Sequence, residues 1–245
     1  QSANWEADSS GAWQIPDNRS AYPQSFKCDS GFIDLNGSNL APILNGLTNF
    51  TLSLWYKQDA VSNRFVFDIK DGTNRVAFQL ANSSTNYFYF NSAFNSYSAV
   101  DTPINQWNNL VFVFDGSQEN ADRIKLYING SQITAATTGT IDSTLGSFGS
   151  STVANLGAAS TGGSLYALNG KISNFQIFNS SLPATGTDSV ETLYNNGVPL
   201  TTTIATDNLK AWYKLDNTAT FSTNWSVPDA SGNGNTGTSS GMTEQ

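Results

Sequence analysis

Apolar and polar residues alternate along most of this chain. In the segment 49–57, which reads NFTLSLWYK, one face of an extended strand would carry Phe50, Leu52, Leu54 and Tyr56. This period of two predicts a β-strand with one buried face. The same pattern predicts strands at 64–70, 75–81, 87–90, 107–115, 123–128, 132–134, 170–178 and 209–215.

Turn-forming residues separate these strands. Asp71-Gly72-Thr73-Asn74 joins the strands 64–70 and 75–81, and Asn129-Gly130 joins 123–128 to 132–134. Asn-Gly between two alternating runs is a strong signal for a hairpin. Many short strands with such turns predict an all-β fold, an antiparallel β-sandwich of the jelly-roll type.

Helical patterns are scarce. The one good candidate lies near 188–195, where Asp188 fits the N-cap, Glu191 follows three residues later as in a capping box, and Asn196-Gly197 ends the helix. After the last predicted strand, Ser231–Gly241 is rich in Gly, Ser and Asn. We expect an extended or mobile tail there.

Composition narrows the available chemistry. The 245 residues include no His and one Cys, Cys28, which we expect to be buried. This excludes His-based catalytic triads, zinc sites that use His and an internal disulfide. The net charge of −8 disfavours nucleic acid and anionic membranes as partners. Residues 1–30 lack the apolar run of a signal peptide, and the initial Gln suggests a processed form or a piece of a longer protein.

A short motif occurs near both ends of the chain. The run 13–17 reads WQIPD and the run 225–229 reads WSVPD. Chance similarity and a tandem repeat of modules are the two explanations. We divide the chain into an N-terminal extended segment at 1–23, a domain at 24–207, and a closing strand with a Gly/Ser-rich tail at 208–245.

Several motifs in a fixed order resemble one superfamily. They are NFTLSLWYK at 49–57, the strand and turn at 107–116, IKLYINGSQ at 124–132, NLGAA at 155–159, NGKISNFQIFNSSL at 169–182 and VETLYNNG at 190–197. They are similar to laminin G-like modules of the concanavalin A-like lectin/glucanase superfamily, which implies a concanavalin A-like jelly roll. LKAWYKLD at 209–216 and DASGNGNTGT at 229–238 resemble the start of another module, as in virion proteins of tailed bacteriophages. Bacterial surface adhesins carry similar modules.

Because the superfamily includes glucanases, we also searched for catalytic acids. Those enzymes use a Glu-x-Asp-x-Glu strand, which sets carboxylates side by side for hydrolysis. Glu6 and Asp8 have no third acid after them. Sialidase-like enzymes need three arginines, but Arg19, Arg64, Arg75 and Arg123 are scattered, and we interpret them as surface charge near turns. We therefore predict that the protein is not an enzyme.

An aromatic stretch is the best candidate for a ligand-binding face. Sugars stack their C–H faces on Tyr, and Asn side chains both donate and accept hydrogen bonds. The candidate ligand-binding residues are Tyr87, Tyr89, Asn91, Asn95 and Tyr97. In the structural alternative, Phe88 and Phe90 face the core while Tyr87 and Tyr89 cover the other side of the sheet.

Aspartates near predicted strand ends are weak candidates for metal ligands. Ca²⁺ prefers carboxylate and carbonyl oxygens on loops, and laminin G-like folds often hold it. The candidates are Asp68, Asp71 and Asp115, with Asp101 and Asp142 in similar positions. Asp is equally typical of turns, where it accepts hydrogen bonds from the nearby backbone. We expect no other cofactor.

These observations predict a non-enzymatic interaction module displayed on a bacteriophage particle, on the capsid surface or a tail fibre. Its partners would be host glycans or neighbouring virion subunits, and we expect a homo-oligomer on the virion or another extracellular surface. A bacterial cell-surface adhesin module and a divergent glycoside hydrolase are the alternatives.

Overall fold

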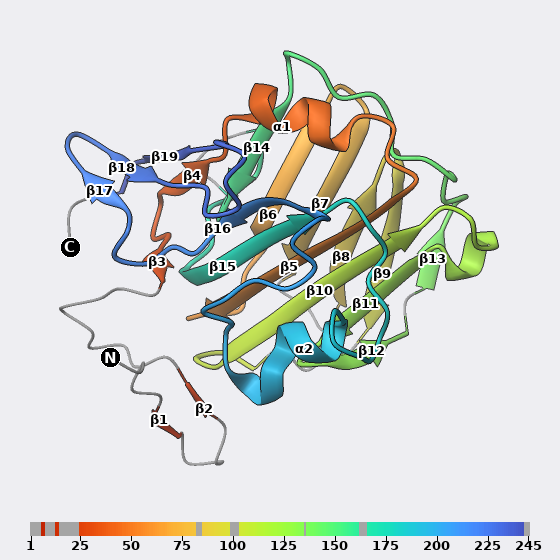
Figure 1. Cartoon of the computed structure of the whole chain (residues 1–245), viewed down its shortest axis with the longest axis horizontal. Coiled ribbons are helices and arrows are strands. Elements are labelled where there is room, and N and C mark those ends of the chain that lie inside the picture. Colours follow the sequence, from red (N-terminus) through yellow and green to blue (C-terminus); the bar gives the residue numbers. More distant parts are fainter. Residues whose placement is uncertain are drawn as a thin grey trace.

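Two β-sheets packed face to face form the body of the molecule in the computed structural model (Figure 1). The structure describes residues 25–81, 85–98, 103–134, 136–161 and 166–242, and before them only the strand pair β1 (Glu6–Ala7) and β2 (Trp13–Gln14). The named strands pair antiparallel throughout. The predicted all-β sandwich is therefore confirmed.

One sheet has ten strands. In spatial order they are β13 (Ala136–Thr138), β9 (Ala93–Ser98), β8 (Thr85–Phe90), β7 (Asn74–Leu80), β6 (Arg64–Asp71), β14 (Val153–Leu156), β4 (Phe32–Asp34), β19 (Gly237–Ser240), β18 (Trp225–Val227) and β17 (Thr220–Phe221). The predicted hairpin between β6 and β7 is present, with Asp71 opposite Asn74. Its two-residue turn sets the register of this pair as far as Phe67, where a bulge shifts it.

The other sheet has seven strands. Six of them run in the order β12 (Ser131–Ile133), β11 (Ile124–Ile128), β10 (Trp107–Asp115), β5 (Asn49–Gln58), β15 (Gly170–Phe178) and β16 (Leu209–Tyr213), and β3 (Phe26–Lys27) also pairs with β15. The Asn-Gly hairpin between β11 and β12 is confirmed. Both turn residues have positive φ, 51° for Asn129 and 77° for Gly130, as a type I′ turn requires.

Aromatic rings join the two sheets at the centre of the core. The alternation in β8 turns Phe88 and Phe90 inward, where they meet residues of β10 in the other sheet. Phe88 stacks on Phe112 with ring centroids 3.9 Å apart, and Phe90 lies 4.5 Å from Phe114. All four side chains are buried, so this layer fixes how the sheets face one another. Cys28 is buried as predicted, and burial raises the pKa of its thiol.

In the described part of the chain two short α-helices accompany the sheets, together with single turns of 3₁₀-helix. The α-helices are α1 (Gly37–Leu44) and α2 (Val190–Tyr194); the 3₁₀ turns are η1 (Asn120–Asp122) and η3 (Asn195–Gly197). The helix predicted near 188–195 is α2, but its N-cap is Ser189, whose hydroxyl accepts from Thr192 N, and not Asp188. The sequence prediction missed α1, which contains Pro42 and has no side-chain cap.

The chain after residue 207 belongs to the sandwich. β16 pairs with β15 in one sheet, and β19 pairs with both β4 and β18 in the other. The expectation of an extended or mobile tail at Ser231–Gly241 is therefore wrong, because this segment contains a strand with buried residues such as Ser239. Its Gly- and Ser-rich composition hid a strand that pairs on both sides.

A loop closes the outer edge of β16. Asp229 accepts hydrogen bonds from Trp212 N at 2.9 Å and Asn235 N at 3.0 Å, while the Asn233 and Asn235 amides donate to Lys210 O at 3.1 Å. Burial raises the pKa of Asp229, but hydrogen bonds from Ser231 and these backbone groups together hold it below the ordinary value. Side chains of the loop thus satisfy backbone groups that an edge strand leaves unpaired.

Candidate functional site

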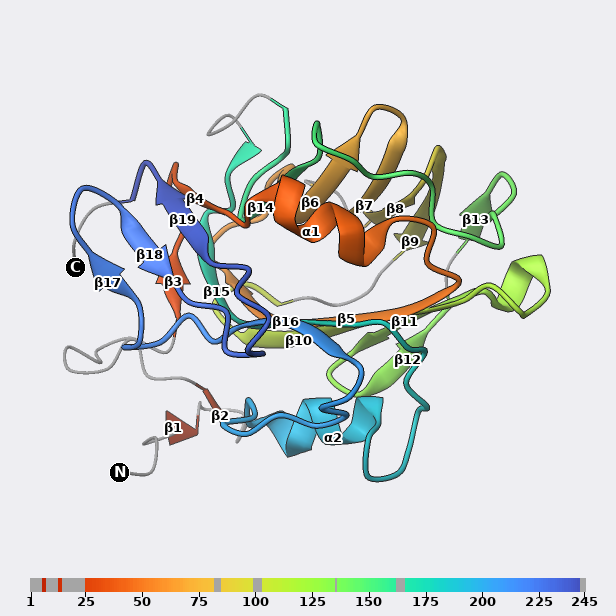
Figure 2. The same cartoon turned by 45° about the horizontal axis from the view of Figure 1, so that its top comes forward.

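The outward face of the seven-stranded sheet is covered. The outward residues of β5, Thr51, Ser53, Trp55 and Lys57, are all buried. Figure 2 shows α2 lying under this sheet, on the side away from the ten-stranded sheet. Leu193 of α2 packs with Val111 and Trp212 in a second apolar cluster. At these residues the outward face of the seven-stranded sheet is therefore buried in the protein interior.

Along β7 and β8, the outward face of the ten-stranded sheet is partly exposed, unlike the covered face of the seven-stranded sheet. In β8, Tyr87 and Tyr89 are partly exposed and alternate with buried Phe88 and Phe90. The prediction that these two tyrosines lie on the face away from the core is confirmed. The residues opposite Tyr87 and Tyr89 in β7 are Gln79 and Ala77, which share this face.

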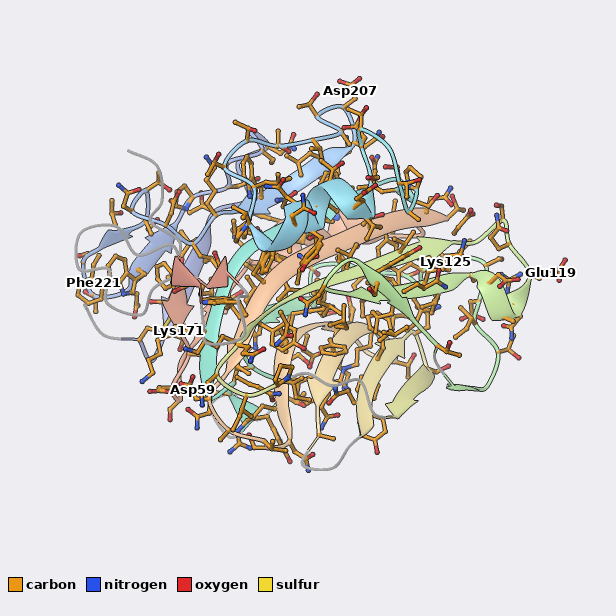
Figure 3. All side chains as sticks on the ribbon, turned by 90° about the horizontal axis from the view of Figure 1, so that it is seen from below. Asp59, Glu119, Lys125, Lys171, Asp207 and Phe221 are labelled. Carbon is orange, nitrogen blue, oxygen red and sulfur yellow. The ribbon has the colours of Figure 1, made fainter. Side chains whose placement is uncertain are left out.

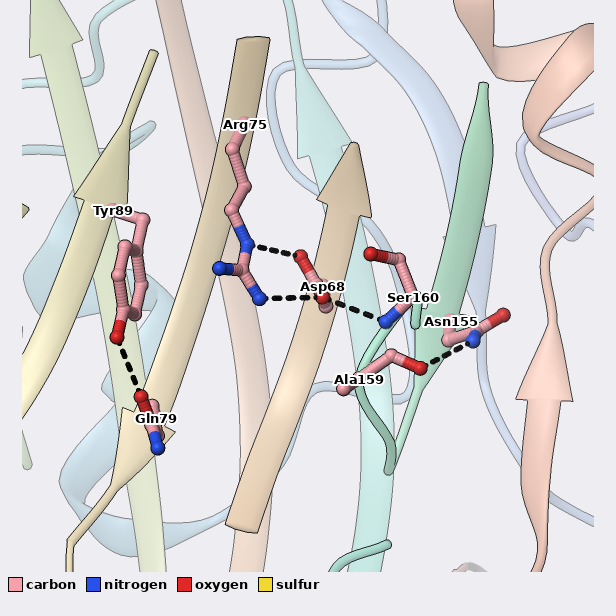
Figure 4. Close-up of polar contacts among 7 residues, drawn as sticks. All are labelled: Asp68, Arg75, Gln79, Tyr89, Asn155, Ala159 and Ser160. Atoms are coloured by element: carbon pink, nitrogen blue, oxygen red, sulfur yellow. Dashed lines mark hydrogen bonds and ion pairs between the residues drawn. The ribbon is translucent and has the colours of Figure 1, made fainter. Parts of the chain in front are cut away.

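An ion pair lies on this face beside Tyr89. Arg75 Nε and Nη2 donate to the two carboxylate oxygens of Asp68, each at 2.7 Å (Figure 4). Ser160 N also donates to Asp68 Oδ2, at 2.6 Å. The Asp68 side chain is fully buried, and that of Arg75 is 18% exposed. A bidentate pair of this kind fixes the plane and direction of the guanidinium.

The guanidinium lies over two aromatic rings. Arg75 Cζ is 4.7 Å from the centroid of the Phe65 ring and 4.4 Å from that of Tyr89. Tyr166 meets Phe65 edge-on at 6.4 Å and is itself 44% exposed, whereas Phe65 is only 6% exposed. Cation–π contacts of this type contribute about 0.5–2 kcal/mol each. The result is a preassembled platform, which we define as Phe65, Arg75, Gln79, Tyr89 and Tyr166.

The hydroxyl of Tyr89 is also fixed. It donates to Gln79 Oε1 at 2.6 Å (Figure 4). Burial raises the pKa of Tyr89, although the nearby Arg75 charge partly opposes this. The phenol therefore remains protonated at neutral pH, and its ring is held at one end by Gln79 and on one face by Arg75.

The remaining residues predicted to bind ligand are placed differently. Asn91 is buried in the β8–β9 turn, where Nδ2 donates to Asp142 at 2.7 Å and Thr144 O at 3.1 Å, and Oδ1 accepts from Gly146 N at 2.9 Å. Its amide is occupied in joining the turn to the 142–146 loop. Although β9 is defined, the side chains of Asn95 and Tyr97 lie outside the described residues.

Two of the predicted metal ligands are engaged by protein donors in turns. Asp71 accepts from Ser151 Oγ at 2.7 Å, Gly149 N at 2.8 Å and Thr152 Oγ1 at 3.0 Å. These bonds, the one from Ser151 first, hold the pKa of Asp71 below its ordinary value. Asp115 accepts from the hydroxyl of Ser117 at 2.6 Å and from its N–H at 3.1 Å, and its pKa is lowered mainly for this reason.

The third predicted ligand, Asp68, is paired with Arg75 as described above. Across the described residues, no group of three or more Asp, Glu or Cys side chains is placed to hold a metal ion. Asp71 and Asp115 therefore have the turn role that the sequence left as the alternative to Ca²⁺ binding, whereas the ion-pair role of Asp68 was not anticipated.

Sequence reasoning missed most of the platform. It interpreted Arg75 as surface charge near a turn, and it did not consider Gln79, Phe65 or Tyr166. The hairpin register would have revealed part of it, because the turn pairs Asp68 with Ala77 and Lys70 with Arg75. Asp68 and Arg75 are thus diagonal neighbours on one face, within reach of long side chains.

Comparison with known proteins identifies the class. The family model of the concanavalin A-like lectin/glucanases superfamily matches residues 30–186, and the chain belongs to this family. No curated protein matches the sequence.

Three solved structures of bacterial proteins have a similar fold. A candidate carbohydrate-binding protein from Bacteroides ovatus is similar with a TM-score of 0.59 and 14% identity, over 91% of this chain and 57% of that one. The NanB sialidase of Streptococcus pneumoniae gives a TM-score of 0.53 and 22% identity, over 74% and 28%. The CBM40 module of a Ruminococcus gnavus sialidase, bound to α2,6-sialyllactose, gives 0.50 and 15%, over 67% and 98%. At these identities the likeness establishes the fold alone.

Among the described residues, the structure contains no helix with both the length and the apolar character needed to cross a membrane.

Proposed function

We propose that the protein is a non-enzymatic glycan-binding module. The observation that carries the proposal is the platform on the outward face of the ten-stranded sheet, where Arg75 and Tyr89 are held in place by Asp68 and Gln79. A partly exposed tyrosine offers an apolar surface for a sugar ring, and fixed donors beside it orient the ring. Preorganised groups of this kind lose little entropy on binding.

Two of the similar structures support a carbohydrate ligand. The Bacteroides ovatus protein is described as a candidate carbohydrate-binding protein, and the Ruminococcus gnavus module was solved with a bound sialyllactose. Neither supplies the site residues of this chain, which come from the geometry above.

Binding without hydrolysis fits the chemistry of the platform. Retaining glycosidases place two carboxyl groups about 5–5.5 Å apart, and one of them must be able to give or take a proton. The carboxylate of this cluster, Asp68, is buried and already accepts from Arg75 and Ser160. The sequence also lacks the Glu-x-Asp-x-Glu strand of the glucanases.

Display on a bacteriophage particle is the second part of the proposal. Support comes from the resemblance of the 209–238 segment to modules of virion proteins, and from a composition poor in charge and rich in Ser, Thr and Asn. Immunogold labelling of purified particles, with a bacterial envelope fraction as the comparison, tests it. Label on the envelope but not on particles would instead favour a bacterial adhesin.

A glycan array followed by titration calorimetry tests the binding. We expect Tyr89→Ala to weaken the best array ligand by about tenfold or more, since one stacking contact is lost. Phe221→Ala is the matched control, because Phe221 is a partly exposed aromatic on β17, at the far end of the same sheet (Figure 3). Equal affinity of Tyr89→Ala and the unmodified protein would reject the platform as the site, and release of reducing sugar would reject the non-enzymatic assignment.

A further inference from the structure

The platform has unused hydrogen-bonding capacity, and it consists of donors. A guanidinium carries five N–H groups. Arg75 uses one on Nε and one on Nη2 for Asp68, and in the part of the chain that the structure describes Nη1 has no hydrogen-bond partner. In Figure 4 this nitrogen points from Arg75 toward Tyr89.

At Gln79 and Asp68, too, the acceptor oxygens are occupied, and in the described part of the chain the N–H donor of Gln79 remains unused. Gln79 Oε1 is taken by the Tyr89 hydroxyl, which leaves the Nε2 amide, without a partner among the described residues, as a donor. Both oxygens of Asp68 are taken by Arg75, and one also accepts from Ser160 N. The acceptors of the cluster are therefore occupied, and its free edge offers N–H groups.

The charges on this face also favour a ligand that accepts hydrogen bonds. Lys70 lies directly opposite Arg75 in the β6–β7 pair, so two cations are adjacent while Asp68 supplies one negative charge. Like charges directly opposite each other in a sheet are destabilising. Lys70 forms no ion pair with the described residues. The platform thus has a local excess of positive charge in a chain whose net charge is −8.

From these observations we infer that the ligand is an acidic sugar, whose carboxylate is read by Arg75 Nη1 with Lys70 as a second cation. The inference rests on the proposed function. Gln79, at the hydroxyl end of the Tyr89 ring, donates to another oxygen of the same sugar. A neutral sugar presents hydroxyls that need both donors and acceptors, whereas a carboxylate needs donors only. Charge-assisted bonds to guanidinium are also the stronger kind.

Titration calorimetry on the full chain with matched probes tests this. The probes are trigalacturonate with its methyl ester, and sialyllactose with lactose, so that the two pairs separate hexuronates from nine-carbon acidic sugars. Of the two acidic probes, the one with the higher affinity should bind about tenfold more tightly than its uncharged counterpart, because one charge-assisted hydrogen bond contributes about this much. The methyl ester keeps a carbonyl acceptor and removes the charge, so a weak ester shows that charge is recognised.

Two variants sharpen the test. Lys70→Met should weaken the acidic probe about threefold to tenfold, and the neutral probe less, because only the carboxylate interacts with the ammonium. Gln79→Glu places a negative charge beside Tyr89 and should remove the preference for acid. Lys125→Met is the control, since Lys125 lies on β11 of the other sheet (Figure 3) and should leave both affinities unchanged. Urea unfolding midpoints verify that each variant is folded.

The outcomes separate the two proposals. If neutral and acidic probes bind equally well and Tyr89→Ala weakens both, the inference is overturned and glycan binding stands. If no probe or array glycan binds, or if Tyr89→Ala has no effect, both fail. An acid preference that Lys70→Met and Gln79→Glu reduce, and Lys125→Met does not, supports the inference.

Discussion

The outward faces of the two sheets follow the same alternation but have different surroundings. On β5 the outward residues Thr51, Ser53, Trp55 and Lys57 are buried, and Tyr194 of α2 stacks on Trp55. On β7 and β8 the outward residues Arg75, Gln79 and Tyr89 remain partly exposed. One face is stabilised by a separate layer of chain, and the other by contacts among its own side chains.

This difference separates structural from binding roles. On the covered face, apolar side chains contribute through the area they remove from water. On the open face, the ion pair of Asp68 and Arg75 itself covers Phe65, and the fixed groups keep unused donors at the surface. We expect substitutions on the first face to lower stability, and substitutions of the partly exposed residues on the second face to act chiefly on affinity.

The largest expected effect is on the covered face. Trp212 is 3% exposed, and its Nε1 donates to Asn174 Oδ1 at 2.5 Å. Trp212→Ala should lower the free energy of unfolding by about 3–5 kcal/mol, because it leaves a cavity and removes a buried hydrogen bond. Tyr89→Ala, a similar truncation on the open face, should cost about 1 kcal/mol. Urea unfolding measures both, and equal losses would contradict the distinction between the faces.

The ion pair is next in size. Asp68→Ala leaves the guanidinium of Arg75 mostly buried without its partner and should cost about 2–3 kcal/mol, less than a fully buried pair because the arginine keeps some contact with water. The double variant Asp68→Ala/Arg75→Met should be more stable than Asp68→Ala alone, since no uncompensated charge remains. A double-mutant cycle by urea unfolding measures the coupling, and additive losses would show that the pair does not act as a unit.

A substitution at the start of α2 should destabilise the segment that covers the seven-stranded sheet. Ser189 Oγ accepts from Thr192 N at 3.2 Å, so Ser189→Ala should cost about 1 kcal/mol, the usual contribution of an N-cap. Hydrogen exchange should rise in α2 and leave β7 and β8 unchanged. Faster exchange at the platform as well would mean that the two faces are coupled. Asp188→Ala is the companion variant, because Asp188 accepts from Ala205 N instead of capping the helix.

The smallest effect concerns pH. The pKa of Asp71 is lowered in the folded protein, chiefly by the hydrogen bond from Ser151, so its contribution to stability is complete above the ordinary value of 3.8 and is lost as the pH falls through the lower folded value. Asp71→Asn should therefore be less stable than the unmodified protein at pH 7, and the gap should narrow in acid. Urea midpoints at pH 7, 4 and 2.5 test this, and parallel curves would contradict it.

The alternation of apolar and polar residues predicted which side of each strand faces the core. No sequence pattern predicted which chain segments cover the outward faces of the sheets. The central strands β5, β10 and β15 match their predicted ranges closely, because each buries a row of apolar side chains. In β15 the side chains of Ile172, Phe175 and Ile177 are buried, and their uneven spacing reflects the bulge between Ser173 and Gln176. The irregular segment that covers β5 has no such period, so polar Thr51 and Ser53 gave no indication of burial.

The candidate site shows the same limit. Tyr87 and Tyr89 could be assigned to the outward face from β8 alone, because they alternate with phenylalanines that are buried in the core. Arg75 and Gln79 reach Tyr89 through the pairing of β7 with β8, and Asp68 through the pairing of β6 with β7. Such contacts depend on the register of two hairpins, which single-strand patterns do not contain.

The loop that closes β16 has a consequence for samples in which many molecules are close together. A bare edge strand is a template on which another chain can add its own strand, and repeated addition produces fibres. Here Asp229, Asn233 and Asn235 already occupy the backbone groups that such an addition would need. Adjacent molecules at high density are therefore not expected to polymerise by adding strands to this edge.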